Sequence, residues 1–585
     1  MRTTMRLAPL RQTASAARLA PMVAVPAARR GLAQVSDAAV KTARGKAPEI
    51  EPYLLEELDV VKRGDKKAIE QLPPFVISRE RGFLPRQDPL ATLPPAFDNL
   101  SSLLDRMTIR QPADANGERK PGLLAKGEFG DAVLSELDPE GAEARAVDQA
   151  IASGNSHLIA ALFRDYCFMT SAYLLEPVDI AFRKTGLYAR GRDVLPRQLA
   201  VPLKKLADKL GHFPYMEYAS SYALQNYRVK DPNHQGTAGK YSFDNMELIR
   251  SFEDAAGSER GFILVHVEMV SYTGRLVSAT EDALRAVTNN DAPALEEAFE
   301  RLLTTYRKIN LSMDTMWGRS LPSDYLKYRS FIFGTGPKKG ENGMFPEGVV
   351  YEGVSDEPQF YRGESGANDS IVPTGDNLLE ITRHMPNNDL TKTLRDFRTY
   401  RPKNQREFLQ QLEGRATLAG VRDFAMETSG SARAKALYIL LVDQIREFRN
   451  RHWMFTKSYI IERSTYDIAT GGSPILQYLP NNLSTVLKVL DESYADFSAD
   501  DEHTLGSQQA RSGSAISNIE LLEAVRSAGK RAGAQRRMLE REVSELLAAK
   551  EKRVQSLGGD VEKGRGMLGE HRDTGRGWVG NDGVG

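Results

Sequence analysis

The sequence predicts a mostly α-helical protein, and the spacing of its apolar residues is the main reason. Leu199, Leu203, Leu206 and Leu210 recur at steps of three and four residues, which is the apolar stripe of an amphipathic helix. A longer stripe with the same period runs through residues 438–459. Strict alternation of apolar and polar residues over the length of a strand is scarce. We therefore expect an all-α fold.

The composition narrows the classes of protein to which the chain can belong. Its 585 residues include 78 Lys and Arg against 78 Asp and Glu, so the formal net charge is zero. This balance argues against nucleic acid as a partner, because a general nucleic-acid binder carries a basic excess. The single cysteine, Cys167, excludes a disulfide framework and a cysteine-based zinc or iron–sulfur site within the chain. No apolar run approaches the roughly 20 residues that span a bilayer, so no integral membrane segment is expected.

Residues 1–45 are expected to stand outside the fold. The first 36 residues contain six arginines and no acidic residue. Such a basic, hydroxyl-rich segment is typical of a mitochondrial presequence, although its three prolines weaken the helix that a presequence forms. The alternative is a disordered basic tail. The expected location is therefore mitochondrial, and otherwise cytoplasmic.

The chain changes character again after residue 495. Residues 496–515 are polar, contain Gly and Ser, and indicate a linker. Residues 516–557 predict a charged helix with a broken apolar stripe, for which a solvated helix is favoured over a short coiled coil or a helix that binds a partner. Residues 558–585 are rich in Gly and charge and are expected to be disordered.

Two histidines stand on apolar stripes. Read as one helix, residues 438–459 place His452 in the middle of an apolar face. That face consists of Tyr438, Leu441, Ile445, Phe448, His452, Phe455 and Tyr459, and the opposite face carries Asp443, Arg446, Glu447 and Arg451. His266 has the same kind of place on a stripe within residues 262–276.

An imidazole that faces the core must satisfy both of its ring nitrogens. A hydrogen-bonded structural histidine does so, and so does a metal or haem ligand whose second nitrogen is held by a neighbour. Two such helices in one α-helical chain suggest a haem with one histidine below the iron and one above the open position. The stripes alone leave both interpretations open, and they do not say which histidine would be the ligand.

Two loops are built from small residues. ATGGSP, residues 469–474, lacks the Gly-Lys-Ser/Thr of a phosphate loop, but Thr470 and the amides of Gly471 and Gly472 could hold a carboxylate or an amine. The alternative for this loop is a plain turn. GESGANDS, residues 363–370, could approach a flat ligand closely because it lacks bulk.

Several separated blocks of residues 50–495 form a recognisable series. In order they are RGFLP (81–85), RDYCFMTSAYLLEP (164–177), PYMEYASSYALQNY (214–227), GFILVHVEMV (261–270), GVVYEGV (348–354), GESGANDSIVPTGDNLLEI (363–381), FRTYRPKNQREFL (397–409), HWMFTKSYII (452–461) and ATGGSPILQYLPNNL (469–483). Together, in this order and spacing, they resemble the indoleamine 2,3-dioxygenase family, in a fungal-looking form. The resemblance implies an all-helical haem-binding fold with a small N-terminal domain, residues 46–215, and a large catalytic domain, residues 216–495.

The resemblance also implies an activity. Members of the family bind haem b, here one per chain, and insert both atoms of O2 across the indole C2–C3 bond of L-tryptophan. The product is N-formylkynurenine, and the reaction opens the kynurenine route to NAD. A cellular reductant must first make the ferrous iron. The alternatives are a non-enzymatic haem protein of the same fold that binds O2, and a scaffold that recruits a partner through residues 516–557.

Residues that match the family's haem site can be named by position. The resemblance makes His452 the proximal iron ligand. It places Arg449 near a haem propionate with Asp376 as its acidic partner. Ser365 and Gly366 match the small residues over the haem.

Residues that match the substrate pocket follow in the same way. They are Tyr218 and Ser221, which line the pocket, the aromatic Phe262, Arg329, which pairs with the substrate carboxylate, and Thr470 with Gly471, which close on the substrate. A guanidinium fork suits the carboxylate.

The chain departs from the family pattern at three places. His266 stands at the distal position, where mammalian members have serine; it could bond the indole N–H or the bound O2 as a catalytic residue, or bind the iron and block it. Asp324 replaces an aromatic residue, and Tyr325 is expected to take over its contact with the indole. Asn368 and Asp369 replace the usual Gln-Ser.

Overall fold

Helices make up most of the part of the chain that the structure describes. The computed structural model describes residues 53–235, 239–385, 392, 395–464, 466 and 468–556. The all-α prediction is confirmed, since strands in these ranges form only two small sheets. The predicted presequence, residues 1–45, and the predicted tail, residues 558–585, lie outside the described residues. The predicted boundary near residue 215 stays a prediction.

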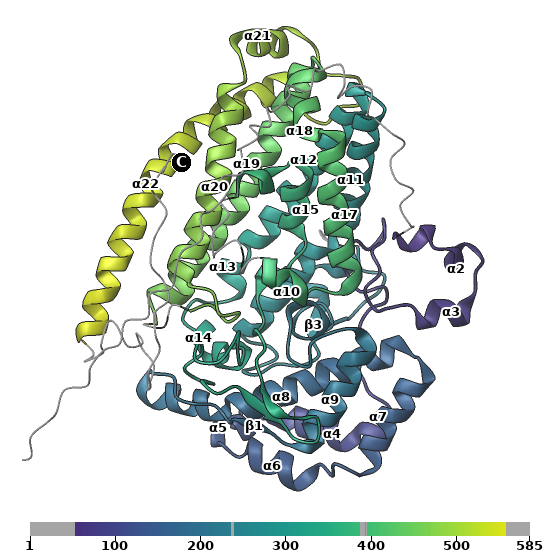
Figure 1. Cartoon of the computed structure of the whole chain (residues 1–585), viewed down its shortest axis with the longest axis vertical. Helices are drawn as coiled ribbons and strands as arrows, with labels where there is room; N and C mark the ends of the chain where they lie inside the picture. The colour runs from purple at the N-terminus through teal and green to yellow at the C-terminus, as the bar shows by residue number, and fades with distance from the viewer. Residues whose placement is uncertain are drawn as a thin grey trace, which may run out of the picture. The chain divides into compact units, whose positions relative to one another are not determined.

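The first helices are α2 (Asp59–Lys62), α3 (Lys66–Gln71), α4 (Asp98–Met107), α5 (Leu123–Lys126), α6 (Phe129–Glu136), α7 (Ala142–Ser153), α8 (Ser156–Thr185) and α9 (Arg197–Leu210), purple to blue in Figure 1. The long buried helix α8 contacts α3 to α7 and α9. Asn155 caps the start of α8 through its side chain, and Gly186 ends the helix with a φ of +74°. The predicted helix over residues 198–210 is confirmed as α9.

Helix α8 has the length and mean hydropathy of a membrane span, but 94% of that stretch is buried inside the protein. Its buried charges are paired within the protein. Arg164 Nε donates to Asp165 Oδ1 at 2.8 Å, and Arg250 Nη2 donates to Asp165 Oδ2 at 2.9 Å. A helix that is apolar on all sides and surrounded by other helices serves as the core of a globular protein.

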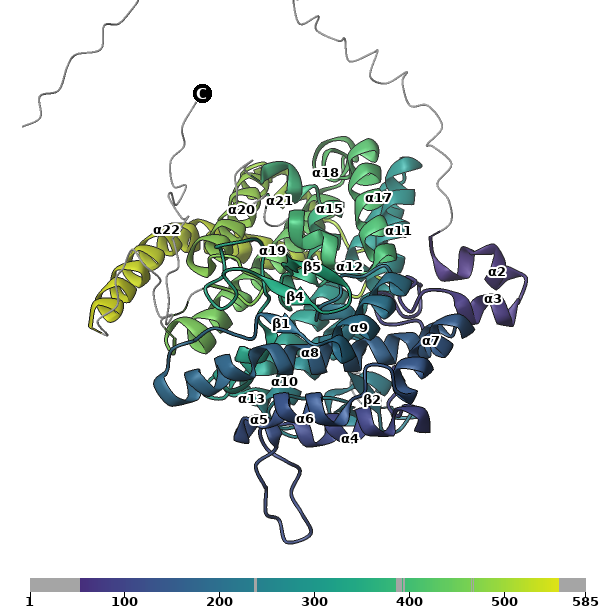
Figure 2. The same cartoon turned by 60° about the horizontal axis from the view of Figure 1, so that its bottom comes forward.

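A second group of helices follows, teal to green in Figures 1 and 2. It consists of α10 (Ser258–Ser271), α11 (Thr273–Thr288), α12 (Ala292–Asp314), α13 (Met316–Arg319), α14 (Tyr325–Arg329), α15 (Ile371–Leu378), α17 (Lys403–Ala419), α18 (Val421–Asp423), α19 (Ala432–Thr456) and α20 (Ile475–Ala495). Helix α12 packs against α11 and α19, and α19 packs against α20. These contacts put α19 at the centre of the group.

Two small sheets tie loops to this group. β1 (Val194–Leu195) runs parallel to β4 (Val349–Tyr351), and β4 runs antiparallel to β5 (Ser355–Gln359). β2 (Tyr227–Val229) and β3 (Met246–Leu248) form an antiparallel pair. The first sheet anchors the chain just before the small-residue loop at residues 363–370.

Helix α19 carries the predicted histidine stripe. Ser431 Oγ accepts a hydrogen bond from Ala434 N at 3.0 Å and caps the start of the helix. The helix runs to Thr456 and passes into a π-helical turn, Lys457–Ile461. Residues 438–459 are therefore helical, as the periodicity predicts.

The segment after residue 495 is more ordered than the sequence suggests. Residues 496–515, expected to be a linker, contain α21 (Ala499–Ser507), which begins with a capping box between Ser498 and Asp501. Residues 516–557, expected to form a solvated helix, contain α22 (Asn518–Ser556), which lies along α20 in Figures 1 and 2.

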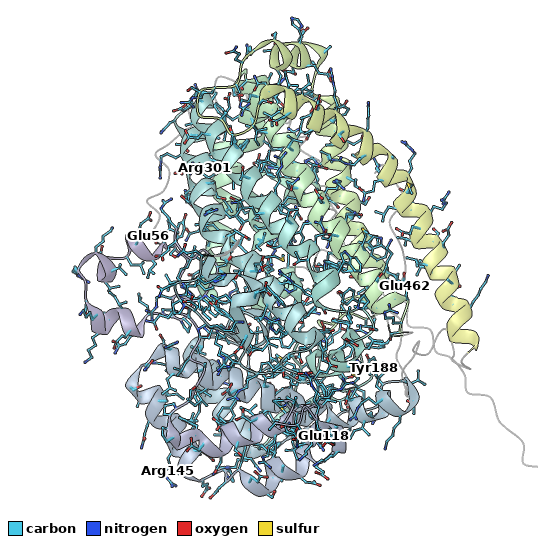
Figure 3. The ribbon with its side chains drawn as sticks, turned by 180° about the vertical axis from the view of Figure 1, so that it is seen from behind. Glu56, Glu118, Arg145, Tyr188, Arg301 and Glu462 are labelled. Atoms are coloured by element: carbon cyan, nitrogen blue, oxygen red, sulfur yellow. The ribbon has the colours of Figure 1, made fainter. Side chains whose placement is uncertain are left out.

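Packing of α22 corrects the solvated-helix expectation. Leu521, Val525, Leu539 and Val543 of α22 are buried, so its broken stripe faces the rest of this chain. The expectation fails because an interrupted stripe still buries apolar area when a neighbouring helix matches it. Side chains on the outer face of α22 point away from the bundle in Figure 3.

Helix α22 also covers part of the face of α19 that looks polar in the sequence. Asp443 and Arg446 are buried, with 3% and 6% of their surface exposed. Arg531 Nη2 donates to Asp443 Oδ2 at 3.1 Å, and Arg446 Nη1 donates to Gln535 Oε1 at 3.1 Å. The two residues also pair with each other, since Arg446 Nε donates to Asp443 Oδ1 at 2.6 Å, so both charges are satisfied within the protein.

Candidate functional site

A cavity lies between α10, α19, the start of α20 and the two small-residue loops. The space among its lining residues measures about 980 Å³ when the part open to solvent is included, and most of its wall is apolar. The predicted site residues that line it are Phe262, His266, Tyr325, Ser365, Gly366, His452 and Thr470. The structure therefore brings both histidine stripes to one apolar space.

His452 presents a neutral imidazole to the cavity. Burial, with a smaller contribution from the nearby His266, lowers its pKa to about 4. Its ring makes no hydrogen bond with any residue that the structure describes. Both ring nitrogens thus lack a protein partner, and one has a lone pair with which to bind a metal.

His266 is held in one tautomer. Its Nδ1 lies 2.8 Å from the backbone oxygen of Phe262, which can only accept, so Nδ1 carries the proton. Burial lowers the pKa of His266, so the ring is neutral and Nε2 is left as an acceptor. The rings of Phe262 and Tyr218 meet the imidazole edge-on, with centroids at 5.5 Å and 5.9 Å.

The residues of the cavity fit a haem. A porphyrin needs an apolar slot, an uncharged nitrogen ligand and small residues where its plane passes. His452 supplies the nitrogen, and a side chain added at Gly366 would meet no atom within 4 Å, so the space beside this glycine is open.

Arg449 and Asp376 meet, as the resemblance implies. Arg449 Nη2 donates to Asp376 Oδ2 at 2.7 Å. Each also has a buried atom without a partner, Nη1 of Arg449 and Oδ1 of Asp376. Neither residue lines the cavity itself, but Arg449 lies one turn before His452, and its free donor suits a propionate.

Arg329 is a buried cation without an acidic partner. It is fully buried and makes no ion pair among the residues that the structure describes. Its Nη2 donates to the backbone oxygen of Ile468 at 2.8 Å, and its Nη1 to that of Tyr466 at 3.4 Å. Arg329 does not line the cavity, but its charge acts on Tyr325, which does.

Comparison with known proteins now decides the family. A family model described as "IDO: Indoleamine 2,3-dioxygenase" matches residues 71–473, which is more than half of the chain. The chain belongs to the indoleamine 2,3-dioxygenase family.

Known relatives agree with this assignment. Indoleamine 2,3-dioxygenase 1 of Rattus norvegicus is 29% identical over 339 residues, or 55% of this chain and 77% of the relative. The indoleamine 2,3-dioxygenase nanC of Aspergillus nanangensis is 27% identical over 421 residues, or 69% and 90%. A protein named myoglobin from Haliotis madaka is 25% identical over 419 residues, or 70% and 96%.

Some residues that match the family's substrate pocket lie behind the cavity wall. The hydroxyl of Tyr218 donates to Asp369 Oδ2 at 3.3 Å, and Ser221 Oγ donates to the backbone oxygen of Glu217 at 2.8 Å. Neither Tyr218 nor Ser221 lines the cavity. Tyr218 still contacts His266, whereas Ser221 bonds within its own π-helical turn.

The two loops that carry family motifs pack against each other. Thr470 Oγ1 donates to the backbone oxygen of Glu364. Gly471 does not line the cavity, and a side chain there would collide with Phe397 and crowd Ser365. Glycine at position 471 therefore lets the 469–473 loop pack closely against Phe397 and Ser365.

The neighbouring side chains of Asp324 and Tyr325 have different surroundings. Asp324 accepts from Ser258 Oγ at 2.7 Å, forms an ion pair with Lys327, and does not line the cavity. Tyr325 faces the cavity and packs on Phe262, with ring centroids 5.3 Å apart. Asp324 thus leaves the aromatic contact to Tyr325.

The sequence did not predict that Glu364 lines the cavity. It stands between Gly363 and Ser365, in a loop whose notable property is its small residues. Only the structure shows that its side chain lines the cavity. A carboxylate in a run of small residues is the signal that could have drawn attention to it.

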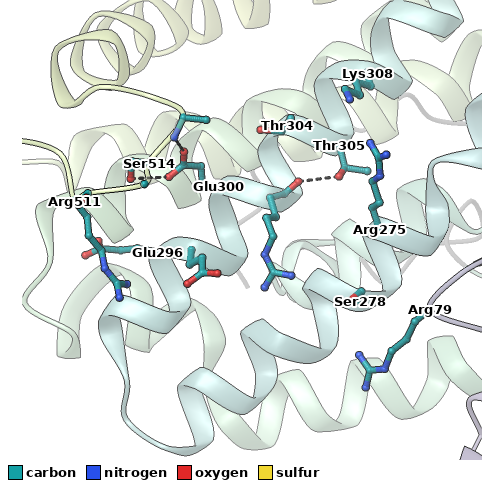
Figure 4. Close-up of a pocket in the computed structure, with 15 residues that line it drawn as sticks. Arg79, Arg275, Ser278, Glu296, Glu300, Thr304, Thr305, Lys308, Arg511 and Ser514 are labelled. Atoms are coloured by element: carbon teal, nitrogen blue, oxygen red, sulfur yellow. Dashed lines mark hydrogen bonds between the residues drawn. The ribbon is translucent and has the colours of Figure 1, made fainter. Parts of the chain in front are cut away.

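A larger hollow, of about 1560 Å³ and partly open to solvent, lies over α11 and α12 (Figure 4). Charged side chains line it, including Arg275, Lys308 and Glu300, and Glu300 accepts from Ser514 Oγ at 3.0 Å. It contains no histidine and none of the predicted site residues. The smaller cavity is therefore the candidate site.

Proposed function

We propose that this family member is a haem-dependent dioxygenase of L-tryptophan, which inserts both atoms of O2 across the indole C2–C3 bond to give N-formylkynurenine. The observation that carries the proposal is the pair of neutral imidazoles, His452 and His266, on one apolar cavity. His452 would hold the haem b, with Arg449 as a donor to a propionate. When bound, the haem would supply the iron that binds and activates O2.

His266 would then orient the substrate. Because its Nδ1–H is fixed on Phe262, its Nε2 is ready to accept a hydrogen bond from the indole N–H. Phe262 and Tyr325 offer aromatic surfaces to the indole ring, and the apolar wall excludes water from it. In this arrangement His266 would act as a hydrogen-bond acceptor for the substrate and not as an iron ligand.

Arg329 would bind the substrate carboxylate. In the structure its donors are held by backbone oxygens at Tyr466 and Ile468, just before the Thr470 loop. A carboxylate is a stronger acceptor for a guanidinium than a carbonyl oxygen, so it would displace them. Substrate binding would thereby release the backbone of Tyr466 and Ile468 and shift Thr470, which follows them.

The runner-up is a haem protein of the same fold that binds O2 without turnover. The similarity to a protein named myoglobin, over 70% of this chain, is the observation in its favour. Arg329 supports the enzyme, because a buried guanidinium without an acid has a use in binding an anionic substrate and none in holding O2.

We likewise propose that the enzyme acts in the kynurenine route, that a cellular reductant supplies its ferrous iron, and that the protein is imported into mitochondria.

A direct assay separates the two. The haem-loaded protein is reduced with ascorbate and methylene blue, then given L-tryptophan in air-saturated buffer, while the absorption of N-formylkynurenine is followed. The proposal expects product that accumulates over many turnovers and needs both L-tryptophan and O2. A stable oxygen complex with no product would establish the runner-up instead.

A further inference from the structure

We propose that Glu364 binds the ammonium group of the substrate, so that the cavity selects indoles whose side chain carries a primary amine. The inference rests on the proposed function, because it takes an indole substrate as the occupant of the cavity. The carboxyl group of Glu364 would form a charge-assisted hydrogen bond with the ammonium, and no bond is made or broken.

The position of Glu364 is the first observation. It immediately precedes Ser365 and Gly366, and its side chain lines the cavity together with both histidines. Only 3% of its surface is exposed. Among the described residues that line the cavity, Glu364 supplies the one carboxyl group, and no Lys or Arg is present.

The missing partner of Glu364 is the second observation. Its carboxyl group makes no hydrogen bond or ion pair with any residue that the structure describes. Burial alone raises its pKa to about 8, with no cation to oppose the shift. Two of the hydroxyls on which its charge acts are engaged elsewhere: Tyr218 donates to Asp369, and Tyr222 donates to Glu259 at 3.2 Å. A buried acid in this state is unfavourable until a ligand supplies a donor.

The surroundings of Tyr325 are the third observation. The charge of Arg329 lowers the pKa of the Tyr325 hydroxyl and the charge of Glu364 raises it, although burial is the largest influence. The charges of an unpaired cation and an unpaired acid therefore both act on one cavity-lining ring. An α-amino acid carries the complementary charges on a single carbon atom. Its carboxylate would go to Arg329 and its ammonium to Glu364.

Three ligands test the assignment on the haem-loaded protein. L-Tryptophan has both groups, tryptamine keeps the amine without the carboxylate, and indole-3-propionate keeps the carboxylate without the amine. Their affinities are measured by titration calorimetry for the wild type and for Glu364→Gln, which keeps the shape and removes the charge. We expect the affinity for L-tryptophan and tryptamine to fall roughly 10-fold to 100-fold, and that for indole-3-propionate to stay or rise.

Two further variants serve as controls. Glu259→Gln is the matched control, because Glu259 is equally buried, has a pKa of about 8 and is bonded within the protein away from the cavity. It should leave the order of the three affinities unchanged. Glu364→Asp keeps the charge, and should retain the preference for amines even if Glu364→Gln fails to load haem.

The outcomes are separable. If the wild type binds the ligands but Glu364→Gln weakens all three equally, or none, Glu364 does not read the amine and the inference fails while the proposed function stands. If Glu364→Asp loses the preference for amines, the charge is not responsible and the inference also fails. If the wild type binds none of the three, the proposed function fails and takes the inference with it.

Discussion

The indole nitrogen of Trp453 donates a hydrogen bond to Glu542 at 3.1 Å, so the residue beside His452 is tied to the C-terminal helix. Lys457, one turn further along, forms an ion pair with the same carboxylate. Helix α22 thus reaches the end of α19 that faces the candidate site.

Removing this tie should loosen haem binding. A chain that ends at residue 515 loses the contacts of buried side chains such as Leu539 and Val543, each contributing about 1.5 kcal/mol or more. We expect a lower melting temperature and faster transfer of haem to apomyoglobin. Glu542→Ala should have the same effects more weakly and lower the free energy of unfolding by about 1 kcal/mol. Replacing the exposed Glu540 by Ala should have no effect. Unchanged haem transfer in the truncated chain would mean that α22 does not support the site.

Loss of the Arg329 guanidinium should weaken substrate binding. Arg329→Ala is expected to raise the KM for L-tryptophan by roughly 10-fold to 100-fold, since a charge-assisted hydrogen bond contributes about 1.5–3 kcal/mol. Arg329→Lys should recover only part of this, because it keeps the charge without the fork. The Soret band reports whether haem is still bound. Kinetics that do not change would place the substrate elsewhere.

His266 should matter for turnover more than for haem binding. His266→Ala removes the acceptor at Nε2, so kcat/KM for L-tryptophan should fall about tenfold or more. The absorption spectrum of the reduced haem protein should stay the same if His266 does not bind iron. A shift from a six-coordinate to a five-coordinate spectrum in this variant would show instead that His266 is an iron ligand.

The buried acid Glu364 makes a prediction about stability and pH. Its pKa is about 8 in the folded protein against an ordinary 4.5, so the folded state holds a proton that the unfolded chain releases. Below pH 4.5 the group is protonated in both states and does not disfavour folding. As the pH rises from 4.5 to 8, the unfolded chain ionises first and the folded protein loses stability, until the buried group also ionises. Glu364→Gln should therefore stabilise the haem-free protein at pH 7 by on the order of 2 kcal/mol, and by little at pH 5. Denaturant unfolding at the two pH values measures the difference in free energy of unfolding between the wild type and Glu364→Gln. An equal difference at both pH values would contradict the raised pKa of Glu364.

Local periodicity and family motifs explain what the sequence could predict. The stripe of α19 is visible because residues three and four apart share a face, and this places His452 without any tertiary information. The contact of Arg449 with Asp376 is different, since nothing local joins two residues so far apart. It followed from the resemblance, and the structure shows that they meet.

Tertiary packing explains what the sequence could not predict. Asp443 and Arg446 look like a solvent-facing pair on one helix, and they do pair with each other. Each also bonds to a residue much later in the chain, Asp443 to Arg531 and Arg446 to Gln535. The direction of the Glu364 side chain depends in the same way on how two loops pack. Periodicity carries no information about either contact.

Haem titration followed by carbon monoxide shows most directly whether His452 holds a haem that can still bind a gas. Hemin is titrated into the purified protein and into His452→Ala, the samples are reduced, and carbon monoxide is added. We expect one haem per chain, a Soret band that shifts on addition of carbon monoxide, and no stable haem in His452→Ala. A normal Soret band in that variant, or a reduced wild-type haem that does not react with carbon monoxide, would contradict this expectation.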